Sequence, residues 1–338
     1  MGWKDLFKSK GTKAKPDPRL RWFGKLPTYA DYYCSQTDED WTVEFNDWML
    51  KGCELYLTRQ RESRGETRVP TAACVIRLPK SQMTVLGAIR DYGGDMRGRP
   101  FPLAFYVGLP SELWPGPTSS GASAALRVLQ ELGRLREQVT RFFNAPGRFD
   151  DAFGGRQLDL TGLDAETSDS SWLQAARTMP LADWFAAARP CPEIDDVNTW
   201  FQRMSAWGDN IAKLESEEFE PTLRFPLAPS LPCDVQVAGW LRWLEQRMDL
   251  EHRHLSLMLL QDAGGSVTRF SVVAREVAPE DFLLATSLAG TLPYVDDLCT
   301  LAPGADVQKQ ADNTDGSTSP IVRAPERWAD FVDSEGVA

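Results

Sequence analysis

The sequence predicts an α+β protein, in which a mostly antiparallel sheet is flanked by helices. The first observation is a close succession of three short apolar segments, residues 71–78, 82–89 and 101–108, bounded by Pro, Gly and Lys. Close succession favours antiparallel pairing, because parallel strands need long crossover connections. The second observation is a predicted hairpin, residues 253–261 and 267–274, whose connection contains two adjacent glycines.

The third observation is helical periodicity. Residues 37–40 consist of one threonine and three acidic residues. They suit a helix N-terminus, where negative charge meets the positive end of the helix dipole. Apolar residues then recur at spacings of three and four up to about Gln60, and again over residues 123–143. The recurring positions in the first helix are Trp41, Phe45, Trp48, Met49, Gly52 and Tyr56.

The remaining elements are shorter. We expect a strand at 20–24, helices near 181–188, 194–206 and 234–248, and a short final helix over 279–288 that Pro279 opens. Residues 144–170 are rich in Gly, Asp and Thr and predict an irregular insertion, and the Pro-rich residues 221–232 predict a connection.

Three regions follow along the chain. Residues 1–18 form a basic N-terminal segment, residues 19–300 one main core with a helical insertion at about 144–220, and residues 301–338 a polar tail. The composition of the tail predicts disorder. Within it, residues 327–332 form an apolar island, for which we weigh a docking motif and favour a weakly ordered remnant.

Composition excludes several classes of function. The 338-residue chain has a net charge of −11 and no basic stripe with interleaved aromatic residues, which excludes nucleic acid as the expected partner. Its six cysteines form no CxxC pair, which favours a reducing compartment. No signal-peptide pattern and no run of 18 apolar residues is present, so we expect a cytoplasmic protein without an integral membrane segment.

Two segments, residues 22–32 and 95–103, combine glycine, proline and charge. Gly allows positive φ and Pro fixes φ, so both segments predict rigid bends. The charged residues leave three alternatives open: a pair of convergent carboxylates, a network of ion pairs that locks two loops, or a patch that contacts a partner. We favour the network, because charges beside buried bends need partners. The candidate residues are Gly24, Lys25, Pro27, Asp31, Asp95, Gly98, Arg99 and Pro102.

Other candidates are weaker. His252 and His254 could begin a zinc site, but such a site needs a third ligand, and we favour ordinary strand histidines. We therefore predict no metal, no cofactor and no catalytic residue. The tryptophan-containing helices predict core, although residues 183–207 are the first candidate for an exposed aromatic surface that binds a partner.

The two bends and the helix between them resemble the TagF (ImpM) family of bacterial type VI secretion. The matching residues are Phe23-Gly24-Lys25-Leu26-Pro27, Ala30-Asp31-Tyr32, Phe45-Asn46-Asp47-Trp48 with Leu50, and Gly93-Gly94-Asp95-Met96-Arg97-Gly98-Arg99-Pro100-Phe101-Pro102-Leu103. Ala30 stands where the family has Gly, and Gly93 stands where it has Ser, so a role of that hydroxyl is absent. The resemblance covers roughly residues 20–110.

The resemblance implies a function without catalysis. TagF-like proteins are post-translational repressors that act in the cytoplasm by holding the forkhead-associated scaffold protein of the secretion system. The expected location is thus cytoplasmic, either free or held at the inner membrane through partners. The alternatives are a metal-dependent hydrolase or phosphatase that uses Asp31 and Asp95, and a structural subunit of a membrane-associated complex anchored by residues 1–18.

Overall fold

A single mixed sheet organises the part of the chain that the structure describes. In this computed structural model the described residues are 17–35, 39–62, 71–112, 119, 121–143, 147–160, 163, 171–189, 194, 196–213, 221–248, 254–261, 267–286, 292–298 and 324–332. Within these ranges the sheet has nine strands in the order β2-β1-β5-β4-β3-β7-β8-β6-β9. All neighbours pair antiparallel except β6 and β9, which are parallel. The strands are β1 (Asp17–Gly24), β2 (Tyr33–Cys34), β3 (Ala72–Leu78), β4 (Met83–Arg90), β5 (Leu103–Pro110), β6 (Thr222–Pro226), β7 (Ser256–Gln261), β8 (Val267–Val273) and β9 (Val295–Asp297).

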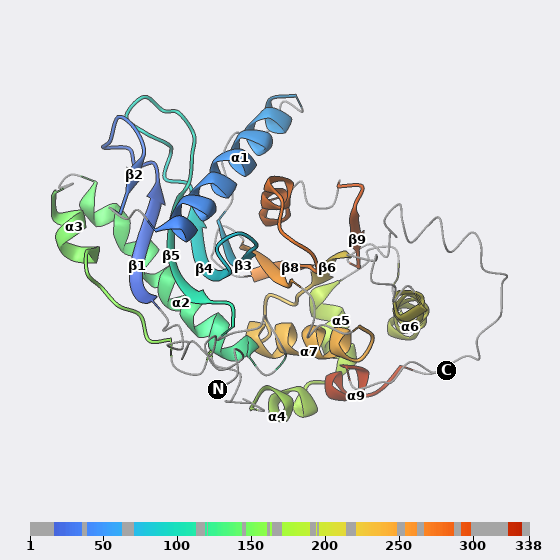
Figure 1. The fold of residues 1–338 in the computed structure, drawn as a ribbon. Helices are drawn as coiled ribbons and strands as arrows, with labels where there is room; N and C mark the ends of the chain where they lie inside the picture. The colour runs from blue at the N-terminus through green and yellow to red at the C-terminus, as the bar shows by residue number, and fades with distance from the viewer. Residues whose placement is uncertain are drawn as a thin grey trace, which may run out of the picture.

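Helices cover both faces of this sheet, which confirms the predicted α+β class and its mostly antiparallel pairing (Figure 1). One face carries α1 and the 3-10 helix η3, and the other carries α2, α7 and several shorter helices. The helices are α1 (Asp40–Glu62), α2 (Ala122–Gln138), η2 (Val139–Phe142), α3 (Gly147–Phe153), α4 (Ser171–Thr178), α5 (Leu181–Ala188), α6 (Val197–Lys213), α7 (Cys233–Glu245), η3 (Pro279–Ala285) and α9 (Trp328–Val332).

The central strands β3, β4 and β5 are largely apolar because both of their faces are buried, and Arg77, Thr84 and Arg90 are the polar exceptions. In β5, Phe105 and Val107 point to the α2 side, whereas Ala104 and Tyr106 point to the α1 side. This alternation follows from the period of two along a strand. The expected single main core is therefore two clusters of buried side chains, one on each face of the sheet.

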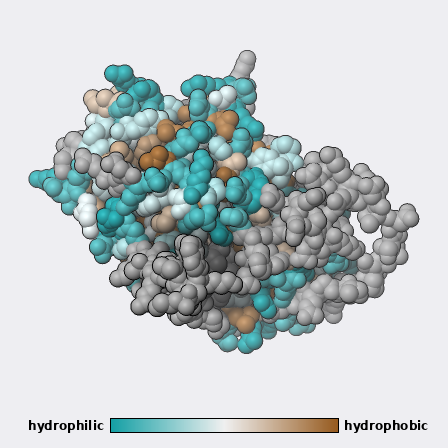
Figure 2. Space-filling model, in the orientation of Figure 1, coloured by the Kyte–Doolittle hydropathy of each residue, from teal (hydrophilic) through white to brown (hydrophobic). Residues whose placement is uncertain are grey.

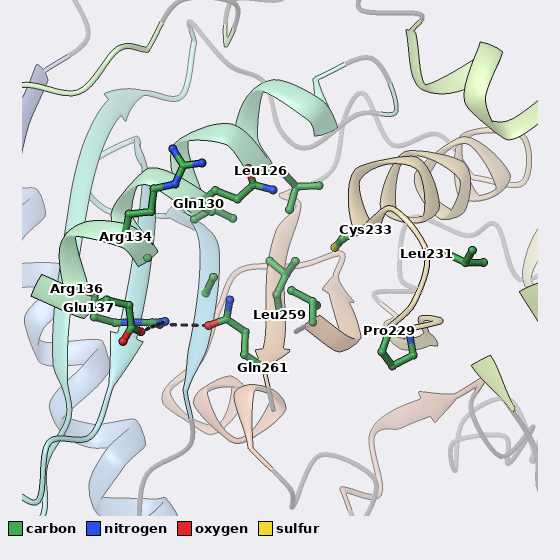
Figure 3. A pocket seen from close by; sticks show the side chains of 14 residues that line it. Leu126, Gln130, Arg134, Arg136, Glu137, Pro229, Leu231, Cys233, Leu259 and Gln261 are labelled. Atoms are coloured by element: carbon green, nitrogen blue, oxygen red, sulfur yellow. Dashed lines mark hydrogen bonds and ion pairs between the residues drawn. The ribbon is translucent and has the colours of Figure 1, made fainter. Parts of the chain in front are cut away.

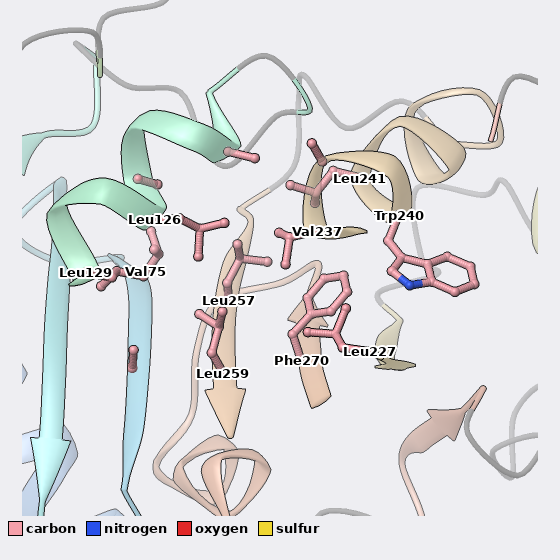
Figure 4. Close-up of a cluster of buried hydrophobic side chains, with 14 of the residues drawn as sticks. Val75, Leu126, Leu129, Leu227, Val237, Trp240, Leu241, Leu257, Leu259 and Phe270 are labelled. Atoms are coloured by element: carbon pink, nitrogen blue, oxygen red, sulfur yellow. The ribbon is translucent and has the colours of Figure 1, made fainter. Parts of the chain in front are cut away.

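The larger cluster fills the space between the sheet, α2 and α7. Figure 4 shows Leu126 and Leu129 of α2 and Val237 of α7 directed toward Leu257 and Phe270 on the strands below them. Burial of such side chains is the main favourable term in folding, at roughly 25 cal/mol per Å² of apolar surface. This packing fixes α2 and α7 side by side across the sheet.

Several expectations were wrong. Residues 147–153 of the supposed irregular insertion form α3, which buries Phe149 and Phe153. Residues 222–226 of the supposed connection form β6, which pairs with β8 and β9. The final short helix is the 3-10 helix η3 and ends at Ala285.

The apolar island at 327–332 is ordered rather than a weakly ordered remnant. Its helix, α9, buries Trp328 and Phe331 within the larger cluster. The Trp328 ring lies 4.5 Å from the Trp184 ring and 5.2 Å from the Trp240 ring, measured between centroids. Part of the predicted disordered tail is thus core, while residues 301–323 and 333–338 lie outside the described residues.

At the N-terminal end of the chain, Asp17 of the predicted basic segment already belongs to β1, and residues 1–16 are not described.

None of the described helices combines the length and the apolar character needed to cross a bilayer.

Candidate functional site

Gly24 brings the two predicted bends into direct contact. It ends β1 with a φ of 149°, in the region that favours glycine. A Cβ atom at this position would lie 2.1 Å from the carbonyl oxygen of Pro102 and 2.5 Å from the Cα of Leu103. The absence of a side chain therefore allows the backbone after β1 to press against the backbone that enters β5.

Two further hydrogen bonds join the bends. The backbone N–H of Met96 donates to the carbonyl of Tyr29 at 2.9 Å, and Nη2 of Arg99 donates to the carbonyl of Ala30 at 2.6 Å. In Figure 1 the loop that follows the end of β1 runs beside the loop that precedes the start of β5. We call residues 24–32 and 95–102 together the corner.

Asp95 is the centre of the corner and is buried. Its carboxylate accepts the backbone N–H groups of Arg97 at 2.9 Å and Arg99 at 3.1 Å, and Nε of Arg99 at 2.6 Å. The Lys25 ammonium, itself 5% exposed, lies 3.3 Å from the same carboxylate. Burial alone would raise the pKa of Asp95, but these donors outweigh it and hold the pKa well below its usual range.

This arrangement predicts a pH dependence of stability. The folded-state pKa of Asp95 lies below the ordinary value of 3.8, so the folded protein binds fewer protons than the unfolded chain, and Asp95 stabilises the fold above that value. Asp95→Asn should lower the melting temperature at pH 7, and its difference from the natural protein should shrink as the pH falls below about 4. Thermal unfolding followed by circular dichroism at several pH values checks this; a difference that stays constant with pH would contradict it.

Asp31 has a different environment from Asp95. It is exposed, its carboxylate caps the N–H of Tyr32 at 2.9 Å, and it lies 3.9 Å from Nη2 of Arg99. Exposed pairs at such a distance contribute little to stability. The two carboxylates thus differ: one is fully engaged inside the corner and the other faces solvent. Among the other candidates, Gly98 has a φ of 70°, Pro102 is buried and Pro27 is half-buried.

The corner also exposes large apolar side chains. Among the described residues the exposed large hydrophobic side chains are Tyr32 at 41%, Met96 at 65% and Val43 at 58%, and the first two belong to the corner. Arg97, between Met96 and Gly98, is exposed and forms no ion pair with any described residue. The coloured part of the face seen in Figure 2 is largely hydrophilic with small apolar patches.

Sequence reasoning did not select Tyr32, Met96 and Arg97 as candidates, although both bends contain them. A signal was present: Met96 and Arg97 stand in a turn between Gly94 and Gly98, where strand or helix periodicity gives them no buried face. Tyr32 is held in place by a stacked contact with Phe23 at 5.4 Å between centroids, and Lys25 Nζ lies 4.8 Å from its ring centre.

The other predicted candidates do not gather at this site. The aromatic residues of the 183–207 segment pack inward, so the expected exposed aromatic surface is wrong there: Phe185 is half-buried, and the buried ones are Trp184, Trp200, Phe201 and Trp207. His254 lies just before β7, and His252 lies outside the described residues. In the described ranges, no three His, Cys, Asp or Glu side chains gather closely enough to hold a metal ion.

Comparison with known proteins gives little further information. No protein-family model matches the chain, and no curated protein matches it. Among solved structures, PA0076 from Pseudomonas aeruginosa PAO1 is similar at 13% sequence identity and a TM-score of 0.32, over 79% of this chain and 95% of that chain. A likeness at this level identifies neither a family nor a function.

Proposed function

We propose that the protein is a non-enzymatic regulator of bacterial type VI secretion that binds a protein partner through the corner. The partner implied by the TagF resemblance is the forkhead-associated scaffold protein, and the implied effect is repression. The observation that carries the proposal is that the two segments bearing the resemblance form one rigid surface, on which Tyr32, Met96 and Arg97 are exposed.

The chemistry of this surface suits protein binding. Aromatic residues, Met and Arg are enriched at protein interfaces, and a few such side chains carry most of the binding energy. Because the Asp95 network fixes the chain on both sides, the backbone at Met96 and Arg97 has little conformational freedom to lose on association.

The same network weighs against the hydrolase alternative. A general base must accept a proton from a substrate or a water molecule, and its pKa is best near the working pH. Asp95 already accepts from Lys25, Arg97 and Arg99, and its pKa is held low. Asp31 is exposed, and its described contacts are the backbone N–H of Tyr32 and the Arg99 guanidinium, so no general-base arrangement surrounds it in the described part of the chain.

The test measures binding of the purified protein to the forkhead-associated protein of the same organism's type VI system. The double variant Met96→Asp, Arg97→Glu should weaken binding by roughly 30-fold or more, the scale of an interface hot spot. Val43→Asp is a matched control, because Val43 is an exposed apolar residue on α1, outside the corner, and should bind as the natural protein does.

Two outcomes would contradict the proposal at different levels. Binding that is lost with Val43→Asp but kept in the double variant would place the interface elsewhere. No binding by the natural protein, together with unchanged secretion after deletion of its gene, would overturn the function itself.

A further inference from the structure

A groove between α2 and α7 is a second candidate site, far along the sheet from the corner. It has a volume of about 470 Å³, which is within the range of small-molecule sites. Its floor is formed by Ala73 and Leu259, paired across β3 and β7, and Leu126, Leu129 and Cys233 contribute to its walls.

Polar and apolar groups are segregated along this groove (Figure 3). Arg136, Glu137 and Gln261 lie together at one end, while Leu231 and Pro229 lie at the other. Burial raises the pKa of the Cys233 thiol to about 12, so this side chain is a neutral, largely apolar part of the wall. A ligand that follows the groove would meet cationic groups at one end and apolar surface at the other.

The polar end has more positive than negative charge close by. Arg136 is 4% exposed, donates to the carbonyl of Ile89 at 3.1 Å and to Gln261 at 3.2 Å, and lies 3.2 Å from the Glu137 carboxylate. Glu137 also pairs with Arg90, so one carboxylate serves two guanidinium groups. Nε of Arg136 is buried and donates to no acceptor in the described part of the chain. Arg136 therefore contributes positive charge beneath the groove, and a direct contact with an anion falls to the exposed Arg134 on the same helix.

Gly133 keeps the groove open. It lies inside α2, where glycine costs roughly 1 kcal/mol relative to alanine. Neither backbone strain nor packing requires it, since its φ is not positive and a Cβ atom there would meet nothing within 4 Å. Gly133 lines the groove, and its missing side chain leaves space there.

We propose that this groove binds a linear aliphatic carboxylate, with the chain along the Leu126, Leu259 and Leu231 side and the carboxylate beside Arg134 and Arg136. A guanidinium group matches the planar geometry of a carboxylate. Arg134 is available because its side chain is 76% exposed and its contact with Glu131 is long, at 3.6 Å. This inference is independent of the function proposed for the corner.

The test uses decanoate as the probe and isothermal titration calorimetry on the full-length protein. Decanoate should bind one site, whereas butyrate lacks the chain and decyltrimethylammonium reverses the charge, and both should bind at least about tenfold more weakly, a difference of about 1.4 kcal/mol. Equal binding of decyltrimethylammonium, or no binding of decanoate, would overturn the proposal.

Variants locate the binding. Gly133→Leu fills the groove from a position with open space and should weaken decanoate binding at least about tenfold, while the control Gly133→Ala should change it by less than about threefold. Arg134→Gln, a change at an exposed position, should leave folding intact and weaken decanoate binding, because it removes a guanidinium group proposed to hold the carboxylate. Decanoate binding that is the same in Gly133→Leu and in the natural protein would place it elsewhere and overturn the assignment.

Discussion

Gly24→Ala should destabilise the protein on the order of 4 kcal/mol, because two costs combine: the strained backbone and the collision of the new methyl group with Pro102 and Leu103. Neither neighbour can move easily, since the atoms in question are backbone atoms at the start of β5. Chemical denaturation, with the free energy of unfolding extrapolated to water, measures the effect.

Gly93→Ala is the matched control for this substitution. Gly93 also has a positive φ, of 94°, but a Cβ atom there would meet nothing within 4 Å. It should therefore cost only the conformational strain, roughly 1–2 kcal/mol. If both variants lost the same stability, close contact between the two bends would not be what requires glycine at position 24.

The second large effect is expected at α9. Trp328→Ala should destabilise the protein by roughly 3–5 kcal/mol, the usual cost of removing a buried tryptophan side chain. The indole is fully buried against Trp184, Trp240 and Phe331, so its loss leaves a cavity walled by rigid rings that cannot close it. Denaturant unfolding monitored by far-ultraviolet circular dichroism checks this without relying on tryptophan emission.

Asp330→Ala provides the comparison within the same helix. Asp330 is exposed, and surface substitutions usually change stability by less than about 0.5 kcal/mol. A small loss for Trp328→Ala, comparable to that for Asp330→Ala, would show that α9 is not an energetic part of the core.

The strongest features of the sequence predicted the fold well. The strands near 72–78, 83–90 and 103–110 were predicted because they are continuous apolar segments, and that character reflects burial on both faces of the sheet. The helices α1 and α7 were predicted because their apolar residues recur at helical spacing over several turns.

The failures have physical causes. The β6 strand is five residues long, follows Pro221 and ends at Pro226, so local turn signals outweighed its apolar pattern. The α9 helix has only five residues, and its stability comes from rings at positions 184 and 240, which no local pattern can indicate.

The candidate site was predicted in part. Gly and Pro indicated where the chain bends, and Lys25, Asp95 and Arg99 do lie together. Which side chains face solvent depends on how two loops about 70 residues apart pack, as the bond from Arg99 to Ala30 illustrates. Local sequence patterns place Met96 and Arg97 in a turn, but they do not show that this turn packs beside residues 29–30.

The docking of α9 has a consequence for protein synthesis. Trp184 and Trp240 are synthesised long before Trp328, which packs against both of them in the folded protein. By contrast, β1, β5, β4 and β3 are consecutive neighbours in the sheet, and all four lie in the first third of the chain. For the time needed to make about 90 further residues, several seconds at ordinary elongation rates, the rings of Trp184 and Trp240 therefore lack the contact that Trp328 later supplies.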